Sequence, residues 1–150
     1  MIGYVSFADK NAFLDSKGNV VEISKEVYSG IPVITGVKIK EATLGEKLPL
    51  KNDAPIKAIS KLCANLKTTS ITWKEEERTL TDLVNVIDYD EKGNLTIAIG
   101  ATFISLGDSN NLEGKMLEIT NILPSIQGKT GTLHLEGYEA GGKDHTYTFK

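Results

Sequence analysis

The sequence predicts an α+β domain with a mostly antiparallel β-sheet and two main α-helices packed on one face. Two segments, residues 53–66 and 110–128, carry apolar residues at helical spacing. Most of the remaining chain consists of short apolar runs separated by turn residues, which is typical of strands. Alternation within these runs makes one face of each strand polar, so we expect helices on one face of the sheet only.

Seven strands are expected from short β-prone runs bounded by Gly, Asn, Asp or Ser. Two pairs of them form hairpins, with turns at Asp15–Gly18 and Asp90–Asn94. The expected strands are Ala12–Leu14, Asn19–Ile23, Leu83–Tyr89, Leu95–Ile99, Thr102–Leu106, Thr132–Glu136 and His145–Phe149.

The first helix is expected to begin after Asp53, which can cap it, and Pro55 suits its first turn. The spacing of the apolar residues places them in a stripe along one face of this helix. The stripe consists of Ile56, Ile59, Leu62, Cys63 and Leu66.

For the second helix, Asn110 followed by Glu113 forms a capping-box pattern, and Gly128 can close the helix. Pro124 removes a backbone hydrogen bond near the end and should kink or shorten the helix. The apolar stripe consists of Leu112, Met116, Ile119, Leu123 and Ile126. Residues 37–52 are polar, and both loop and strand remain open for them.

Composition favours one globular domain over residues 1–150. The formal net charge is −3 and Arg78 is the single arginine, so a nucleic-acid partner is disfavoured. The sequence has neither an apolar run of about 20 residues nor a signal-peptide pattern. Cys63 is the single cysteine and excludes an internal disulfide.

Motifs for metal, cofactor or nucleophilic chemistry are absent from the sequence. Residues 88–93 imitate the start of a calcium loop, but Lys92 and Ile99 occupy positions that need oxygen ligands. His134 and His145 could face each other on neighbouring strands, without a third ligand in view. We therefore expect a protein that is not an enzyme, with no catalytic, cofactor-binding or metal site.

The C-terminal segment His145–Phe149 is β-prone and aromatic, and it lies at the end of the chain. Such a strand either lies at a sheet edge, where a partner strand can add to it, or pairs on both sides. The pattern alone leaves both possibilities open.

Several segments, in order, resemble the FtsQ/DivIB family of bacterial cell-division proteins. Phe13–Val21 is similar to the family's "Leu/Val-Asp-x-x-Gly" hairpin, and Ile31–Gly36 to its "Leu-Pro-x-Ile-x-Gly" segment. Leu95–Ile97 and Ile104–Gly107 resemble the strand and Leu-Gly step that precede a helix in the family. Gly131–Tyr138 resembles the strand that follows that helix.

The resemblance implies the extracytoplasmic β domain of a Gram-positive DivIB-like protein, beginning near Tyr4–Phe7. Members of the family have one transmembrane helix and a POTRA domain, which this chain lacks. The chain is therefore expected to be a domain excised from a longer membrane-anchored protein, with Met1 as an added start. The expected location is the outer side of the cell membrane, enriched at the division septum.

The family acts as a scaffold of the divisome that binds FtsL-like and FtsB/DivIC-like proteins, without a cofactor. In the family the partner adds a β-strand to the last strands of the β domain. Carried onto this chain, the resemblance implies partner-binding residues near the C-terminus. These residues are Tyr138, Gly141, His145, Thr146, Tyr147, Thr148 and Phe149. Thr148→Pro is then predicted to remove a backbone N–H donor of the β-ladder and to weaken partner binding. Tyr147 and Phe149 are expected on one face as aromatic anchors.

Two alternatives belong to other functional classes. A module that binds cell-wall glycans or another small ligand would use Trp73, Tyr28 or Tyr89 as stacking surfaces. A hydrolase would need a pair of carboxylates in a cleft.

Overall fold

The computed structural model describes residues 1–138 and 147–150. These residues form a nine-stranded sheet in the order β11-β10-β9-β8-β7-β4-β1-β2-β3, and a separate hairpin of β5 and β6. The strands of the large sheet are β1 (Gly3–Phe7), β2 (Lys10–Leu14), β3 (Val20–Ser24), β4 (Val33–Thr35), β7 (Val86–Tyr89), β8 (Leu95–Ile99), β9 (Thr102–Gly107), β10 (Gly131–His134) and β11 (Thr148–Phe149). The other elements are α1 (Ala54–Thr68), β5 (Ser70–Trp73), β6 (Glu76–Thr79), the 3₁₀ turns η1 (Leu80–Asp82) and η2 (Leu123–Ile126), and α2 (Leu112–Ile122).

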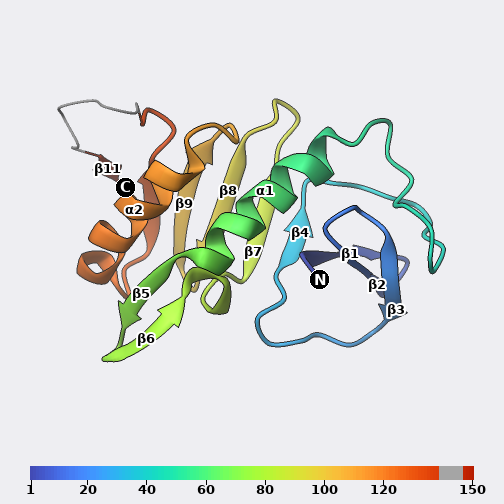
Figure 1. The fold of residues 1–150 in the computed structure, drawn as a ribbon, viewed down its shortest axis with the longest axis horizontal. Helices are drawn as coiled ribbons and strands as arrows, with labels where there is room; N and C mark the ends of the chain where they lie inside the picture. Colours follow the sequence, from blue (N-terminus) through green and yellow to red (C-terminus); the bar gives the residue numbers. More distant parts are fainter. Residues whose placement is uncertain (139–146) are drawn as a thin grey trace.

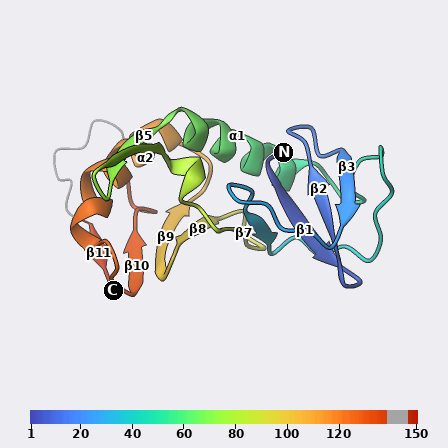
Figure 2. The same cartoon turned by 90° about the horizontal axis from the view of Figure 1, so that it is seen from below.

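Both helices lie on the same face of the sheet, and the opposite face has no helix over it in the described part of the chain (Figure 2). α1 crosses the middle of the sheet, and α2 covers the end that contains β9 and β10 (Figure 1). The pairings of β4 with β1 and β7, and of β9 with β10, are parallel, whereas the others are antiparallel. The expected α+β architecture, with a mostly antiparallel sheet and two helices, is confirmed.

The core lies between the helices and the sheet. The apolar stripe of α1 is confirmed, because Ile59 and Leu62 are fully buried against the sheet. On the sheet, Leu95 and Ile97 of β8 point into the same layer, since alternate residues of a strand share a face. Cys63 is half-buried beside this stripe, and its Sγ donates a hydrogen bond to the Ile2 carbonyl at 3.4 Å.

The predicted capping box of α2 is wrong. The N-cap residue is Asn111, with φ of 57°, and its side chain makes no capping hydrogen bond. The Asn110 backbone N–H instead donates a hydrogen bond to Asp108 Oδ1 at 3.0 Å, so Asn110 belongs to the turn before the helix. At the other end, the helix stops at Ile122 and continues as η2, which confirms that Pro124 shortens it.

The two predicted hairpins are confirmed, and their turns have the same geometry. In the first, Asp15 Oδ1 accepts hydrogen bonds from the backbone N–H groups of Lys17 and Asn19, both at 2.9 Å. In the second, Asp90 Oδ1 accepts the corresponding bonds, both at 2.8 Å. Each carboxylate therefore stabilises its own turn.

Other segments differ from expectation or were left open. The strand predicted over Leu83–Tyr89 begins only at Val86, because residues 80–82 form η1. Residues 37–52 contain no strand, although an isolated bridge joins Asn19 to Lys47. β1 covers Tyr4–Phe7, where the first strands were expected, whereas β4 and the β5–β6 hairpin are additional to the expected set.

Candidate functional site

β11 lies at one end of the strand order, beside β10 (Figure 1). Phe149 pairs with Leu133 and Thr148 with His134, in an antiparallel ladder. Among the described residues, no second strand pairs with the outer side of β11. For Thr148 and Phe149, the structure therefore selects the edge position that the sequence left open.

In β11, the backbone N–H and C=O groups that point away from β10 belong to Phe149. The Lys150 N–H donates to the Thr132 carbonyl at 2.9 Å, so residue 150 faces β10. In an antiparallel ladder the direction of the backbone groups alternates, so Thr148 also faces β10 and Phe149 faces outward. Thr148→Pro would therefore remove a ladder donor, as expected, but that donor faces β10, and the N–H on the outer side of the strand belongs to Phe149.

The side chains of β11 divide between the two faces of the sheet. Phe149 and Tyr147 are half-buried and pack against the core, whereas Thr148 is exposed on the opposite face. The two rings therefore already contribute to this domain's own core. They would contact a partner through their remaining exposed surface, as the continuation of an apolar layer.

Tyr138 lies just after β10, at the end of α2 that contains Gly114. Its backbone N–H donates to the Leu135 carbonyl at 3.0 Å, and its ring packs against Gly114. Tyr138 therefore follows β10, the strand that pairs with β11, and contacts the first turn of α2. Three of the implied residues, Gly141, His145 and Thr146, lie outside the described residues.

A buried lysine fixes the start of α2. The Lys115 side chain is 3% exposed, and its Nζ donates to the Asp108 carbonyl at 3.2 Å and lies 3.7 Å from Asp108 Oδ1. Burial lowers the pKa of Lys115, and the carboxylate of Asp108 opposes this shift. The contact ties α2 to the loop after β9 and so positions Gly114 against Tyr138.

A polar cluster on the open face adjoins β11, and sequence reasoning missed it. His134 Nδ1 lies 2.7 Å from Glu136 Oε1, and Ser105 also hydrogen-bonds the Glu136 carboxylate. Partial burial raises the pKa of Glu136, but these bonds and one from its own backbone N–H outweigh burial and lower it. The parallel pairing of His134 with Ser105 was the missing signal, because it depends on register between distant segments.

His134 and Ser105 both contact the Glu136 carboxylate and not each other among the described residues. A serine nucleophile needs a hydrogen bond to its base. His134 has Thr148 as its neighbour on β11. Residues 1–138 and 147–150 also contain no group of three or more His, Cys, Asp or Glu side chains that could hold a metal ion.

The three aromatic residues considered for glycan binding have different surroundings. Tyr28 packs on Phe13 with ring centroids 5.1 Å apart, and its hydroxyl donates to Glu22 at 2.6 Å. Tyr89 belongs to β7 and packs partly against the core. Trp73 is half-buried and lines a hollow beside the β5–β6 hairpin.

Within the described ranges, every helix is too short or too polar to cross a membrane. No family model, no curated protein and no solved structure matches this chain.

Proposed function

We propose that this chain is a non-catalytic scaffold of the bacterial divisome, in line with its sequence resemblance to the β domain of FtsQ/DivIB proteins. It binds FtsL-like and FtsB/DivIC-like partners on the outer side of the cell membrane. The observation that carries this proposal is the edge position of β11, whose Phe149 backbone faces away from β10.

A partner strand would form main-chain hydrogen bonds with the N–H and C=O of Phe149 and continue the sheet beyond β11. On the helix side, its apolar residues would pack beside the half-buried rings of Phe149 and Tyr147. On the open face, its side chains would lie next to Thr148, in the row that continues to His134. This arrangement requires a partner segment with alternating apolar and polar residues.

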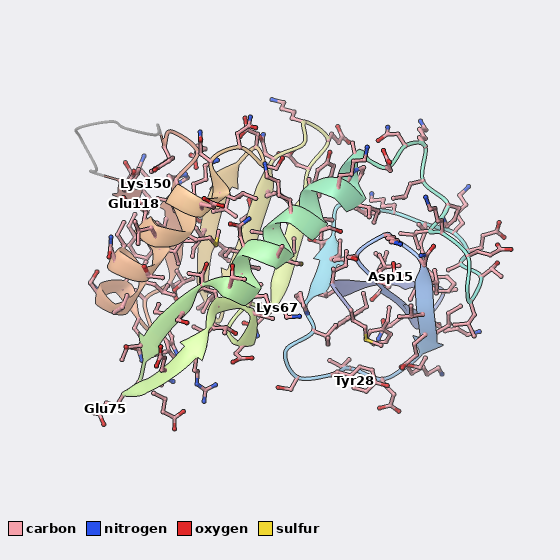
Figure 3. The ribbon with its side chains drawn as sticks, in the orientation of Figure 1. Asp15, Tyr28, Lys67, Glu75, Glu118 and Lys150 are labelled. Carbon is pink, nitrogen blue, oxygen red and sulfur yellow. The ribbon has the colours of Figure 1, made fainter. Side chains whose placement is uncertain are left out.

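The edge also has the surroundings that strand addition needs. Lys150 is exposed at the end of β11 and lies beside Gly131 at the start of β10, and Figure 3 labels it. Tyr138 lies at the other side of this end of the sheet, held against Gly114. A bound strand would therefore run between the exposed Lys150 near the start of β10 and the Tyr138 segment after its end.

The test is an NMR titration of the labelled protein with the soluble extracytoplasmic segment of a DivIC-type partner. Strand addition predicts amide shift changes concentrated at Tyr138 and Tyr147–Phe149, with smaller changes at Leu133 and His134. An absence of shifts at saturating partner, or shifts centred on the opposite edge at β3, would refute the proposal.

A further inference from the structure

A hollow of about 600 Å³ lies where four connections of the chain meet. These are the β5–β6 turn, η1, the β8–β9 turn and the segment between η2 and β10. The residues that matter for the argument are Trp73, Lys74, Asp82, Ile99, Gln127 and Gly128. None of the residues that line the hollow belongs to β11, although Thr102 pairs with Gly131, which Phe149 and Lys150 contact from the other side.

The floor of this hollow is rigid and apolar. Ile99 is 7% exposed and belongs to the core, and Thr102 is buried beside it. The Thr102 hydroxyl donates to the Lys129 carbonyl at 2.6 Å, which fixes the segment after η2 against the start of β9. A preformed floor of this kind lowers the ordering cost of binding a small molecule.

The aromatic wall is Trp73, at the end of β5. Trp73 pairs with Glu76, so Lys74 and Glu75 alone form the turn, and Figure 3 shows Glu75 at the tip of the hairpin. Both turn residues have positive φ, 52° and 70°, although neither is glycine or asparagine. This is the geometry of a two-residue hairpin turn, which Ala8 and Asp9 adopt as well, and it leaves Trp73 at the rim of the hollow.

Three polar side chains around Trp73 have unused hydrogen-bonding capacity. The side chains of Lys74, Asp82 and Gln127 are exposed, and none has a protein partner among the residues that the structure describes. Together they offer a cation, a carboxylate that accepts, and an amide that both donates and accepts. An aromatic side chain with an amide and a carboxylate group lining the same hollow suits a ligand that has an apolar face and a ring of hydroxyls.

We propose that the Trp73 hollow binds a pyranose oligosaccharide of one to three rings. The C–H face of one ring would lie on the indole of Trp73, and its hydroxyls would bond to Asp82 and Gln127. A phosphorylated ligand fits less well, because Lys74 is the single cation lining the hollow in the described residues and Asp82 opposes it. The hollow and β11 share no residue, so the domain would combine protein binding with sugar binding.

Trp73 is the single tryptophan of the chain, so its fluorescence reports on this hollow directly. We would titrate the protein with chitotriose and with cellotriose, which differ in their acetamido groups. A saturable change in emission with either sugar is the expected result, and the preferred sugar would define the recognised substituent. Linear, non-saturating changes with both sugars would overturn the proposal.

Variants are compared by NMR, through the backbone amide shifts of Ala101 and Gln127. Trp73→Ala should weaken binding about tenfold or more, and Trp73→Phe less, because it keeps an aromatic face. Asp82→Asn should weaken binding several-fold without changing the fold, because Asp82 is exposed. Phe103→Ala is the matched control, since Phe103 is an exposed aromatic residue, 45% exposed, on a different surface.

Unchanged sugar binding by Trp73→Ala would also overturn the proposal, as would equal loss in Phe103→Ala. These outcomes are separate from those of strand addition, because variants of β11 should leave sugar binding intact.

Discussion

The ring of Tyr138 lies against the Cα of Gly114, in the space that a side chain at position 114 would occupy. A Cβ there would overlap the Tyr138 hydroxyl and the adjoining ring carbons. The contact joins the first turns of α2 to the segment after β10. It also places one of the proposed partner-binding residues by means of a glycine within a helix.

We therefore predict that Gly114→Ala displaces Tyr138. Alanine favours a helix by about 1 kcal/mol over glycine, but overpacking costs about 1–3 kcal/mol, so the net effect should be neutral to destabilising. Urea denaturation would measure stability, and the partner titration should show affinity reduced several-fold. Gly137→Ala is the control, because a Cβ at Gly137 would meet nothing within 4 Å. Equal partner affinity in both variants would contradict a role for Tyr138.

A second prediction separates the ring of Phe149 from its backbone N–H. Phe149→Ala removes a half-buried ring and should lower the free energy of unfolding by about 2 kcal/mol. Phe149→Pro removes the ring and the outward N–H, which proline tolerates at a sheet edge. Partner affinity should fall about five- to tenfold further in the proline variant. Identical affinities for the two variants would show that this N–H makes no bond to the partner.

Cys63 should be unreactive in the folded protein. Burial raises the pKa of its thiol to about 12, so almost no thiolate exists at pH 8. Reaction with a thiol reagent at this pH should be about a thousandfold slower than for a free cysteine. Adding concentrated urea should restore the ordinary rate. A fast reaction of the native protein would mean that the thiol is open to solvent.

Asp15 should make stability depend on pH. Burial raises the pKa of Asp15, but the hydrogen bonds from Asn19 and Lys17 together outweigh it and lower the pKa below its ordinary value. Because the folded-state pKa is the lower one, this contribution is present above the unfolded value of about 3.9 and is lost as the pH falls through the folded value.

Accordingly, Asp15→Ala should lower the free energy of unfolding by about 1 kcal/mol at pH 7, and the difference from the parent protein should shrink toward about pH 2.5. Urea denaturation at both pH values measures this. The neighbouring Ser16→Ala, an exposed position in the same turn, should change stability little at either pH. A difference that stays constant with pH would mean that the carboxylate charge plays no part.

Elements with local signals could be predicted from the sequence. α1 begins directly after Asp53, as predicted, although the Asp53 side chain makes no capping hydrogen bond. Both Asp turns form where they are expected, because their contacts lie within a few residues. The capping box failed for a local reason as well. Asp108 and Asn110 both have side chains that can accept a hydrogen bond from a nearby backbone N–H, and the sequence pattern does not distinguish between them. In the structure the acceptor is Asp108 Oδ1.

Long-range properties were not predictable in the same way. The edge position of β11 depends on which strands neighbour β10, and the outward direction of Phe149 depends on its register with Leu133. The cluster around Glu136 needs the parallel pairing of β9 and β10. The Trp73 hollow needs four connections to meet, and its single aromatic residue gave no signal of the polar groups around it.

The short strand β4 has a consequence for the order of folding. β4 has three residues and joins β1 and β7 through parallel pairings with segments far away in sequence. The β1–β3 and β7–β9 units, by contrast, are built from neighbouring hairpins that close short loops. We therefore expect two local sub-sheets to form early and to merge late through β4, so that hydrogen exchange would show the β1–β3 unit opening separately from the rest.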